Sequence, residues 1–142
     1  MKITILLLFL SGISFANVLK VGDIFPSNHF SDQFEKKLAI TSQTKEIIIS
    51  FSKKNGKAVK AFLENHKGYL KERQAVYLAD MTSAPSLAIS LFMKPALKKY
   101  GFSVGLIEDD EIAERLPKVE GKTTVISLEK MTIKSIKFVD RL

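Results

Sequence analysis

The chain has 142 residues, no cysteine, and 22 lysine and arginine residues against 15 aspartate and glutamate residues, a net charge of +7. Without cysteine it can form no disulfide and carry out no thiol chemistry, so its stability depends on packing alone. Arginine is rare (Arg73, Arg115 and Arg141) and the lysines are spread along the chain. Nucleic-acid-binding proteins cluster basic residues and prefer arginine, so we expect no nucleic acid partner.

The N-terminus has the three zones of a cleaved secretory signal. A lysine precedes an apolar run over 3–10, and small residues follow it, which predicts cleavage before Asn17. The run is shorter than the ~20 residues of a membrane-spanning helix, so we expect no stable membrane insertion; the alternative is an uncleaved interfacial anchor. The sequence thus predicts a periplasmic or secreted protein, with a signal peptide over 1–16 and one domain over 17–142.

Strand and helix patterns alternate in the first half of the mature chain. An extended lead-in over 21–26 and a short strand over 38–41 precede the run 46–52. Its consecutive isoleucines are typical of a strand that is covered on both faces. Asn55 is the expected N-terminal cap of the helix that follows. A second buried strand is predicted over 75–79.

The next helix contains a proline. Leu87, Leu91 and Phe92 are its expected buried stripe, and Pro95 should break or kink it, because proline has no amide hydrogen and clashes with the preceding turn.

The remaining elements complete an α/β pattern. They are a third strand over 104–107, a short helix over 109–116, and two strands over 124–128 and 132–139 that form a terminal hairpin. Strands that alternate with helices imply a central sheet with parallel strands and helices on its faces.

This order of elements resembles the thioredoxin fold. The lead-in VGDIFP resembles the opening of the peroxiredoxin and thiol–disulfide oxidoreductase branch. The phrases AVYLADMTSAP (75–85), LFMKPALKKY (91–100) and RLPKVEGKTTVISL (115–128) resemble small, cysteine-poor periplasmic proteins related to the YtfJ type, whose function is unassigned. The resemblance implies a thioredoxin-like three-layer α/β/α sandwich with a mixed central sheet and a C-terminal β-hairpin, and with the final helix missing.

The chain departs from this family where the redox chemistry lies. The family's cysteines follow the first buried strand, where this chain has Ser-Lys-Lys-Asn at 52–55. The family's cis-proline aligns with Thr123, and a cis bond before a residue other than proline costs ~3 kcal/mol, so we expect a trans bond there. The resemblance therefore implies no thiol–disulfide activity.

The missing final helix leaves two alternatives open. Either the segment 28–37 covers that sheet face, or an apolar surface stays open. An open apolar surface would mark an interface with an envelope protein or with a second copy of the chain.

The carboxyl ends of the strands are the expected ligand site, because ligands bind there in folds of this kind. Free amide groups at the start of the first helix, with lysines beside them, favour a small anion. The candidate residues on this rim are Ser52, Lys53, Lys54, Asn55, Asp80, Thr82 and Thr123. The alternative is that these lysines are solvated and the threonines are turn residues.

Other motifs carry no chemistry. His29 and His66 have no second ligand at a useful spacing, so no metal site is predicted, and neither a catalytic residue nor a bound cofactor is predicted. The sequence favours an exported, non-redox protein that binds an envelope protein or a small anionic ligand. The alternative is an oxidoreductase or another enzyme that uses a bound cofactor such as a flavin in place of cysteines.

Overall fold

The computed structural model describes residues 17–27 and 30–142; the expected signal peptide, Asn28 and His29 lie outside the described residues. The strands are β1 (Ser31–Asp32), β2 (Glu46–Ser50), β3 (Ala75–Asp80), β4 (Gly105–Ile107), β5 (Thr123–Glu129) and β6 (Thr132–Val139). The helices are α1 (Lys53–Asn65), α2 (Tyr69–Glu72), α3 (Ser86–Ala88), the π-helical η1 (Ile89–Met93), α4 (Lys94–Leu97) and α5 (Asp110–Arg115).

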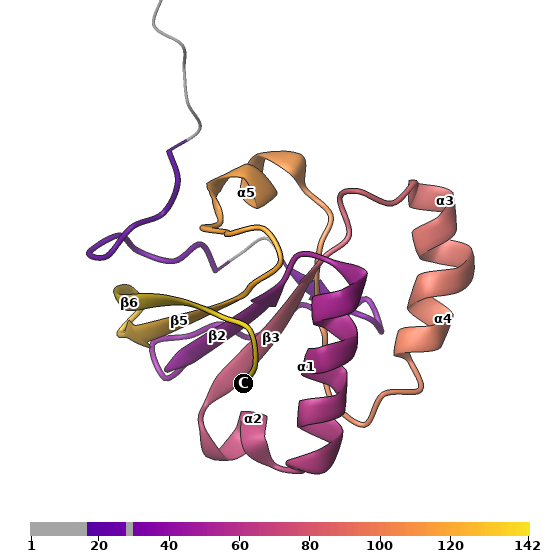
Figure 1. Ribbon diagram of the computed structural model, residues 1–142, viewed down its shortest axis with the longest axis horizontal. Coiled ribbons are helices and arrows are strands. Elements are labelled where there is room, and N and C mark those ends of the chain that lie inside the picture. The colour runs from indigo at the N-terminus through magenta and orange to yellow at the C-terminus, as the bar shows by residue number, and fades with distance from the viewer. Residues whose placement is uncertain (1–16, 28–29) are drawn as a thin grey trace, which may run out of the picture.

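The strands form one mixed sheet in the order β1-β4-β3-β2-β5-β6, with helices on both faces (Figure 1). β2, β3 and β4 are parallel, and β1, β5 and β6 each run antiparallel to the strand beside them. The α/β sandwich with its closing hairpin is therefore as predicted. The hairpin turn places Lys130 and Met131 at positive φ, as in the turns whose twist matches that of paired strands.

The central strand β2 is buried on both faces. Ile47, Ile48 and Ile49 have no exposed surface. Ile48 packs in the apolar cluster that contains Val59 and Leu63 of α1, and its two neighbours pack in the cluster on the opposite face. This confirms the prediction from the isoleucine run.

The face opposite α1 is covered by α5 and by the N-terminal segment. Leu19, Phe25 and Phe30 of that segment pack in one cluster with Ile112 and Leu116 of α5. The expected short strand over 38–41 is wrong: Ser31–Asp32 pairs with β4 instead. Leu38 and Ile40 lie against the apolar cluster, so their burial reflects packing and not strand pairing.

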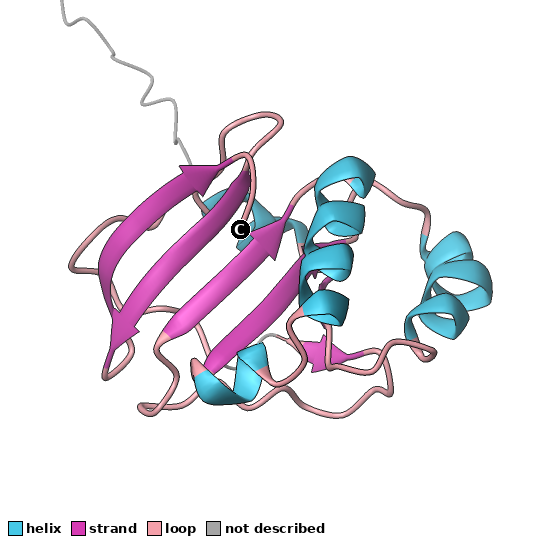
Figure 2. Ribbon diagram, turned by 60° about the horizontal axis from the view of Figure 1, so that its bottom comes forward, coloured by secondary structure: helices cyan, strands magenta, loops and turns pink. Residues whose placement is uncertain are grey.

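The face on the α1 side is open over β5 and β6, where no helix lies in front of the strands (Figure 2). Val125 lies opposite Ile48 in the pairing register and therefore projects to this side of the sheet. Ser127 follows it on the same side of β5, and Ser135 and Lys137 are their partners on β6. After β6, residues 140–142 form no helix, and Leu142 packs against the cluster beneath α1.

The proline-containing helix differs from its prediction. α3, η1 and α4 follow one another without a break, and Leu87, Leu91 and Phe92 are 70%, 56% and 73% exposed. The Lys94 amide donates to the carbonyl of Ile89, five residues earlier. This π turn lies directly before Pro95, which has no amide hydrogen to donate to the α-helical hydrogen bonds. The π turn also adds one residue to the helical turn and so shifts the register of the residues that follow.

The buried stripe of this helical segment is instead Ile89, Met93 and Leu97, which pack in the cluster beneath α1. The prediction was wrong because Leu87 and Leu91, like Ile89 and Met93, are spaced four residues apart, so the helical period alone does not decide which of the two apolar stripes is buried.

Candidate functional site

The predicted rim residues come to one edge of the sheet. β2 and β3 are parallel, so Ser50 and Asp80 end at the same edge. β5 runs antiparallel to β2, with Thr124 opposite Ile49, so Thr123 begins at that edge too. The topology therefore places the expected candidates on a common rim.

The start of α1 is closed by hydrogen bonds within the chain. Ser52, in an extended conformation, is the N-terminal cap, and its Oγ accepts from the Asn55 amide at 3.1 Å. The expectation that Asn55 is the cap was wrong by one turn, since Ser52 precedes the first helical residue. Asn55 is buried, and its Nδ2 donates to the carbonyl of Gly121 at 3.2 Å. This side chain thus ties α1 to the loop before β5.

Asp80 and Thr82, at the end of β3, also hydrogen-bond to each other. The Asp80 Oδ1 accepts from the amide and the hydroxyl of Thr82, at 2.9 and 2.7 Å. Lys53 and Lys54 are exposed, Thr123 is buried, and the bond before Thr123 is trans. Anion binding at this rim therefore stays a prediction that rests on exposed lysines at the start of α1.

A salt bridge lies beside this rim. The Lys122 Nζ lies 2.7 Å from the Asp140 Oδ1. Lys122 lowers the pKa of Asp140 by hydrogen bonding and by its charge, and the charges of Arg141 and Lys54 lower it further. Asp140 thus offsets the positive charge of Lys122 beside the rim.

Replacing Asn55 with leucine should lower the free energy of unfolding by about 2 kcal/mol, because the Gly121 carbonyl loses a buried partner. Asn65→Leu at the exposed end of the same helix is the matched control, and it should change stability by less than about 0.5 kcal/mol. Urea titration of both variants measures the difference. Equal stability of the two variants would contradict the structural role of Asn55.

Two buried hydroxyls lie beneath the first turn of α1. Ser50 Oγ and Tyr77 Oη share a hydrogen bond of 2.7 Å. Burial raises the pKa of Tyr77 from 10.0 to about 12, although the bond to Ser50 acts in the opposite direction. The folded chain therefore holds this proton at a pH where the unfolded chain has released it.

The stability that this proton provides should be complete below pH 10 and should be lost as the pH rises through about 12. The loss reaches about 3 kcal/mol, because each unit of pKa difference corresponds to about 1.4 kcal/mol. Urea titrations across this pH range should show a loss in the wild type that is larger by about this amount than the loss in Tyr77→Phe. Parallel pH profiles for the two proteins would refute the assignment.

A cavity of about 760 Å³ lies at the other end of β3, between the carboxyl end of α1, α2 and the loop over 101–103. Its apolar walls come from Leu38, Leu63, Leu70, Val76 and Phe102. Pockets of this size with apolar walls and a few polar groups are the usual sites for small molecules.

Two lysines and a histidine border this cavity. Lys67, Lys71 and His66 line it, and Glu64 is the one acidic residue among the lining residues. The His66 ring stacks on Phe62, at 4.1 Å between centroids, and its Nδ1 lies 2.8 Å from the Phe62 carbonyl. The border is therefore predominantly basic and partly fixed in position.

Tyr69 also lines the cavity, and its hydroxyl donates to the Glu46 Oε1 at 2.9 Å. Burial, followed by this bond to Glu46, raises the pKa of Tyr69. Its hydroxyl therefore keeps its proton at neutral pH and holds α2 against the start of β2.

Sequence patterns did not predict this cavity, because its walls come from stretches between 38 and 103 that meet only in the folded chain. The local signal was an apolar residue close after a glycine, with Leu70 two residues after Gly68 and Phe102 directly after Gly101, in segments that are typical of turns.

The described residues contain neither a candidate metal cluster nor a membrane-spanning helix. Within 17–27 and 30–142, no three His, Cys, Asp or Glu side chains gather in a way that could hold a metal ion. No helix in that part of the chain is long and apolar enough to cross a membrane.

The chain is similar to known proteins in its structure but not in its sequence. No family model matches the chain, and no curated protein is significantly similar in sequence. A peroxiredoxin-like protein from Aquifex aeolicus has a TM-score of 0.55 and 12% identity, over 89% of this chain and 80% of that one. A thiol peroxidase from Chromobacterium violaceum has a TM-score of 0.54 and 13% identity, over 89% and 80% of the two chains.

The thioredoxin domain of a thiol-disulfide oxidoreductase from Bacteroides vulgatus has a TM-score of 0.54 and 12% identity, over 84% of this chain and 89% of that domain. Identity at this level carries the fold and no activity. The six-stranded mixed sheet, its covering helices and these structural neighbours show that the chain has the thioredoxin-like fold.

Proposed function

We propose that this chain is an exported, non-redox binding protein, and that it binds a small molecule with an apolar body and an anionic group in the cavity between α1, α2 and β3. The observation that carries the proposal is a cavity of about 760 Å³ with apolar walls and a basic border. An apolar body would replace water against Leu63, Leu70 and Phe102, and the anionic group would lie beside Lys67 and Lys71.

The absence of thiol chemistry follows from composition. The structural neighbours include a thiol peroxidase and a thiol-disulfide oxidoreductase, whereas this chain has no cysteine. The turn after β2 holds the Ser52 cap and the Asn55 bond to Gly121. These bonds support a structural role for that turn.

The rim at the start of α1 is a second position for a small anion, supported by exposed Lys53 and Lys54. Replacing both lysines with glutamate should abolish binding of an anion there. Unchanged affinity of that variant would remove the rim from consideration.

Decanoate is a suitable first probe of the cavity, because it joins an apolar chain to a carboxylate. In two-dimensional NMR titrations we expect it to shift the amides of Leu63, Tyr69 and Phe102. Lys67→Glu combined with Lys71→Glu should weaken binding at least tenfold, since both cations at the border become anions. Lys20→Glu with Lys130→Glu changes the net charge equally at exposed sites away from the cavity, and it should bind as the wild type does.

If decanoate shifted only amides at the start of α1, the binding site would be the rim and not the cavity. If both double variants bound decanoate equally weakly, the lysines would act through net charge alone and the cavity proposal would fail. Native mass spectrometry of protein purified from its own cells would identify a retained ligand. A measured mass that matches a chain starting at Asn17 would support export. A yellow preparation with flavin absorbance would favour the cofactor-dependent enzyme instead.

A further inference from the structure

The helical segment 86–97 has two apolar stripes, and the sheet buries one of them. Ile89, Met93 and Leu97 pack in the cluster beneath α1. Leu87, Leu91 and Phe92 project elsewhere, with 70%, 56% and 73% of their surface exposed. The segment lies at the periphery, and no helix or strand of the described residues lies beyond it (Figures 1 and 2). A surface helix normally buries its apolar side, so this second stripe has no partner among residues 17–27 and 30–142.

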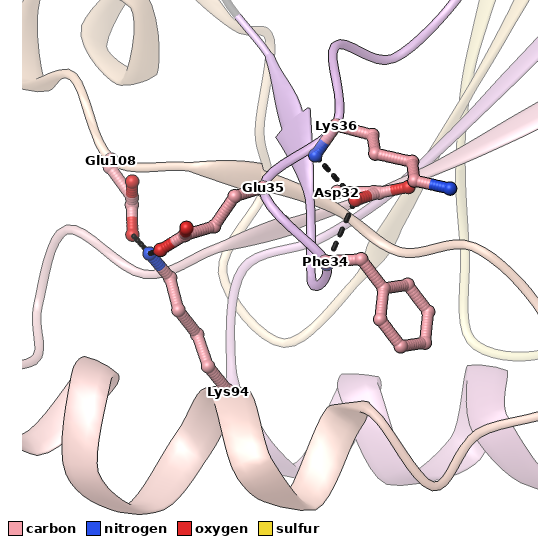
Figure 3. Close-up of polar contacts among 6 residues, drawn as sticks. All are labelled: Asp32, Phe34, Glu35, Lys36, Lys94 and Glu108. Carbon is pink, nitrogen blue, oxygen red and sulfur yellow. Dashed lines mark hydrogen bonds and ion pairs between the residues drawn. The ribbon is translucent and has the colours of Figure 1, made fainter.

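The inner side of the segment is fixed to the body of the protein. The Lys94 Nζ lies 3.4 Å from the Glu108 Oε1 and 3.9 Å from the Glu35 Oε1 (Figure 3). Glu35 projects from a turn that Asp32 closes, because its Oδ1 accepts from the amides of Phe34 and Lys36. These contacts hold the segment with its outer stripe turned away from the core.

The charged residues within and next to the helical segment in sequence are all lysines. Residues 81–107 contain three lysines and no aspartate or glutamate. The two neighbouring carboxylates, Glu35 and Glu108, form ion pairs with Lys94. Lys98 and Lys99 are exposed one turn further along, and no ion pair involves either of them within the described ranges.

We propose that the outer stripe of segment 86–97 docks on the surface of an anionic lipid bilayer. Leu87, Leu91 and Phe92 would enter the boundary between headgroups and acyl chains, while Lys98 and Lys99 would meet the lipid phosphates. Leucine and phenylalanine beside lysine are the pattern of helices that lie in this boundary. The stripe is too short to span a bilayer, so the contact is peripheral and reversible.

The test uses the full chain and lipid vesicles. Wild-type protein should co-sediment with vesicles that contain phosphatidylglycerol, bind pure phosphatidylcholine vesicles far more weakly, and dissociate as salt is added. Lys98→Glu with Lys99→Glu should weaken binding about 25-fold or more, because each lysine near an anionic surface contributes about fivefold. Replacing Leu87, Leu91 and Phe92 with serine should weaken it at least tenfold.

The matched control replaces three exposed apolar residues outside the segment, Val18, Val21 and Ile24, with serine, and it should bind as the wild type does. All these proteins share the same N-terminal apolar run, so differences between them report on the substituted positions. Equal binding by the segment variants and the control would overturn the proposal, as would equal binding to both kinds of vesicle.

The cysteine-free chain also allows a local probe. An environment-sensitive fluorophore on Ser90→Cys should shift to the blue with anionic vesicles, whereas the same dye on Glu129→Cys at the hairpin should not. A blue shift at Ser90→Cys that follows protein concentration without vesicles would show contact between copies of the chain, and the lipid proposal would then fail.

Discussion

Replacing Gln33 with leucine should lower the free energy of unfolding by about 3 kcal/mol, because it leaves buried backbone groups without partners. Gln33 has no exposed surface. Its Nε2 donates to the carbonyls of Phe102 and Leu97, at 2.8 and 3.2 Å, and its Oε1 accepts from the Val104 amide at 2.9 Å. One side chain thus joins the N-terminal segment to the end of α4 and the start of β4.

Gln43→Leu is the matched control, since Gln43 is exposed in a turn, and its effect should stay within about 0.5 kcal/mol. Chemical denaturation measures both variants. Gln33→Glu should also be destabilising, because a carboxylate can accept from Val104 and cannot donate to the two carbonyls. A fully stable Gln33→Leu protein would show that this network contributes nothing to the fold.

Replacing Gly105 with valine should also destabilise the protein by about 3 kcal/mol, because the core has no room for a side chain there. A Cβ on Gly105 would lie 2.5 Å from the Leu78 Cδ2, 2.6 Å from the Leu38 Cδ2 and 3.4 Å from the Tyr77 carbonyl oxygen. The leucine side chains could rotate away, whereas the Tyr77 backbone is fixed by strand pairing.

Gly101→Ala is the control for this substitution, because a Cβ at Gly101 would meet nothing within 4 Å. We expect its melting temperature to match that of the wild type. If Gly105→Val melted at that temperature too, the close approach of Leu38 and Leu78 to β4 would be wrong.

Local sequence was sufficient for the elements that short-range interactions specify. The isoleucines at 47–49 predicted a doubly covered strand, and β2 is buried on both faces. Asp109 was expected to begin a helix, and its Oδ1 accepts from the Glu111 amide at 2.9 Å.

The helical segment 86–97 shows where local periodicity fails. Pro95 lacks an amide hydrogen, and the chain responds with a π turn that changes the register. Leu87, Leu91 and Phe92, which were expected to be buried, are exposed, and Ile89, Met93 and Leu97 pack against the core instead. Both sets contain residues spaced four apart, so the sequence pattern offered two apolar stripes and tertiary packing chose between them.

The sequence by itself determined the absence of thiol chemistry, the order of strands and helices, and the residues that gather at the rim, because composition, short apolar runs and parallel strand order carry that information. Only the tertiary structure decided what covers the sheet, where the cavity lies and which stripe of segment 86–97 faces out. Those features depend on contacts such as the bonds of Gln33 to residues 64, 69 and 71 positions away. Side chains that meet across such distances leave no periodic pattern in the sequence.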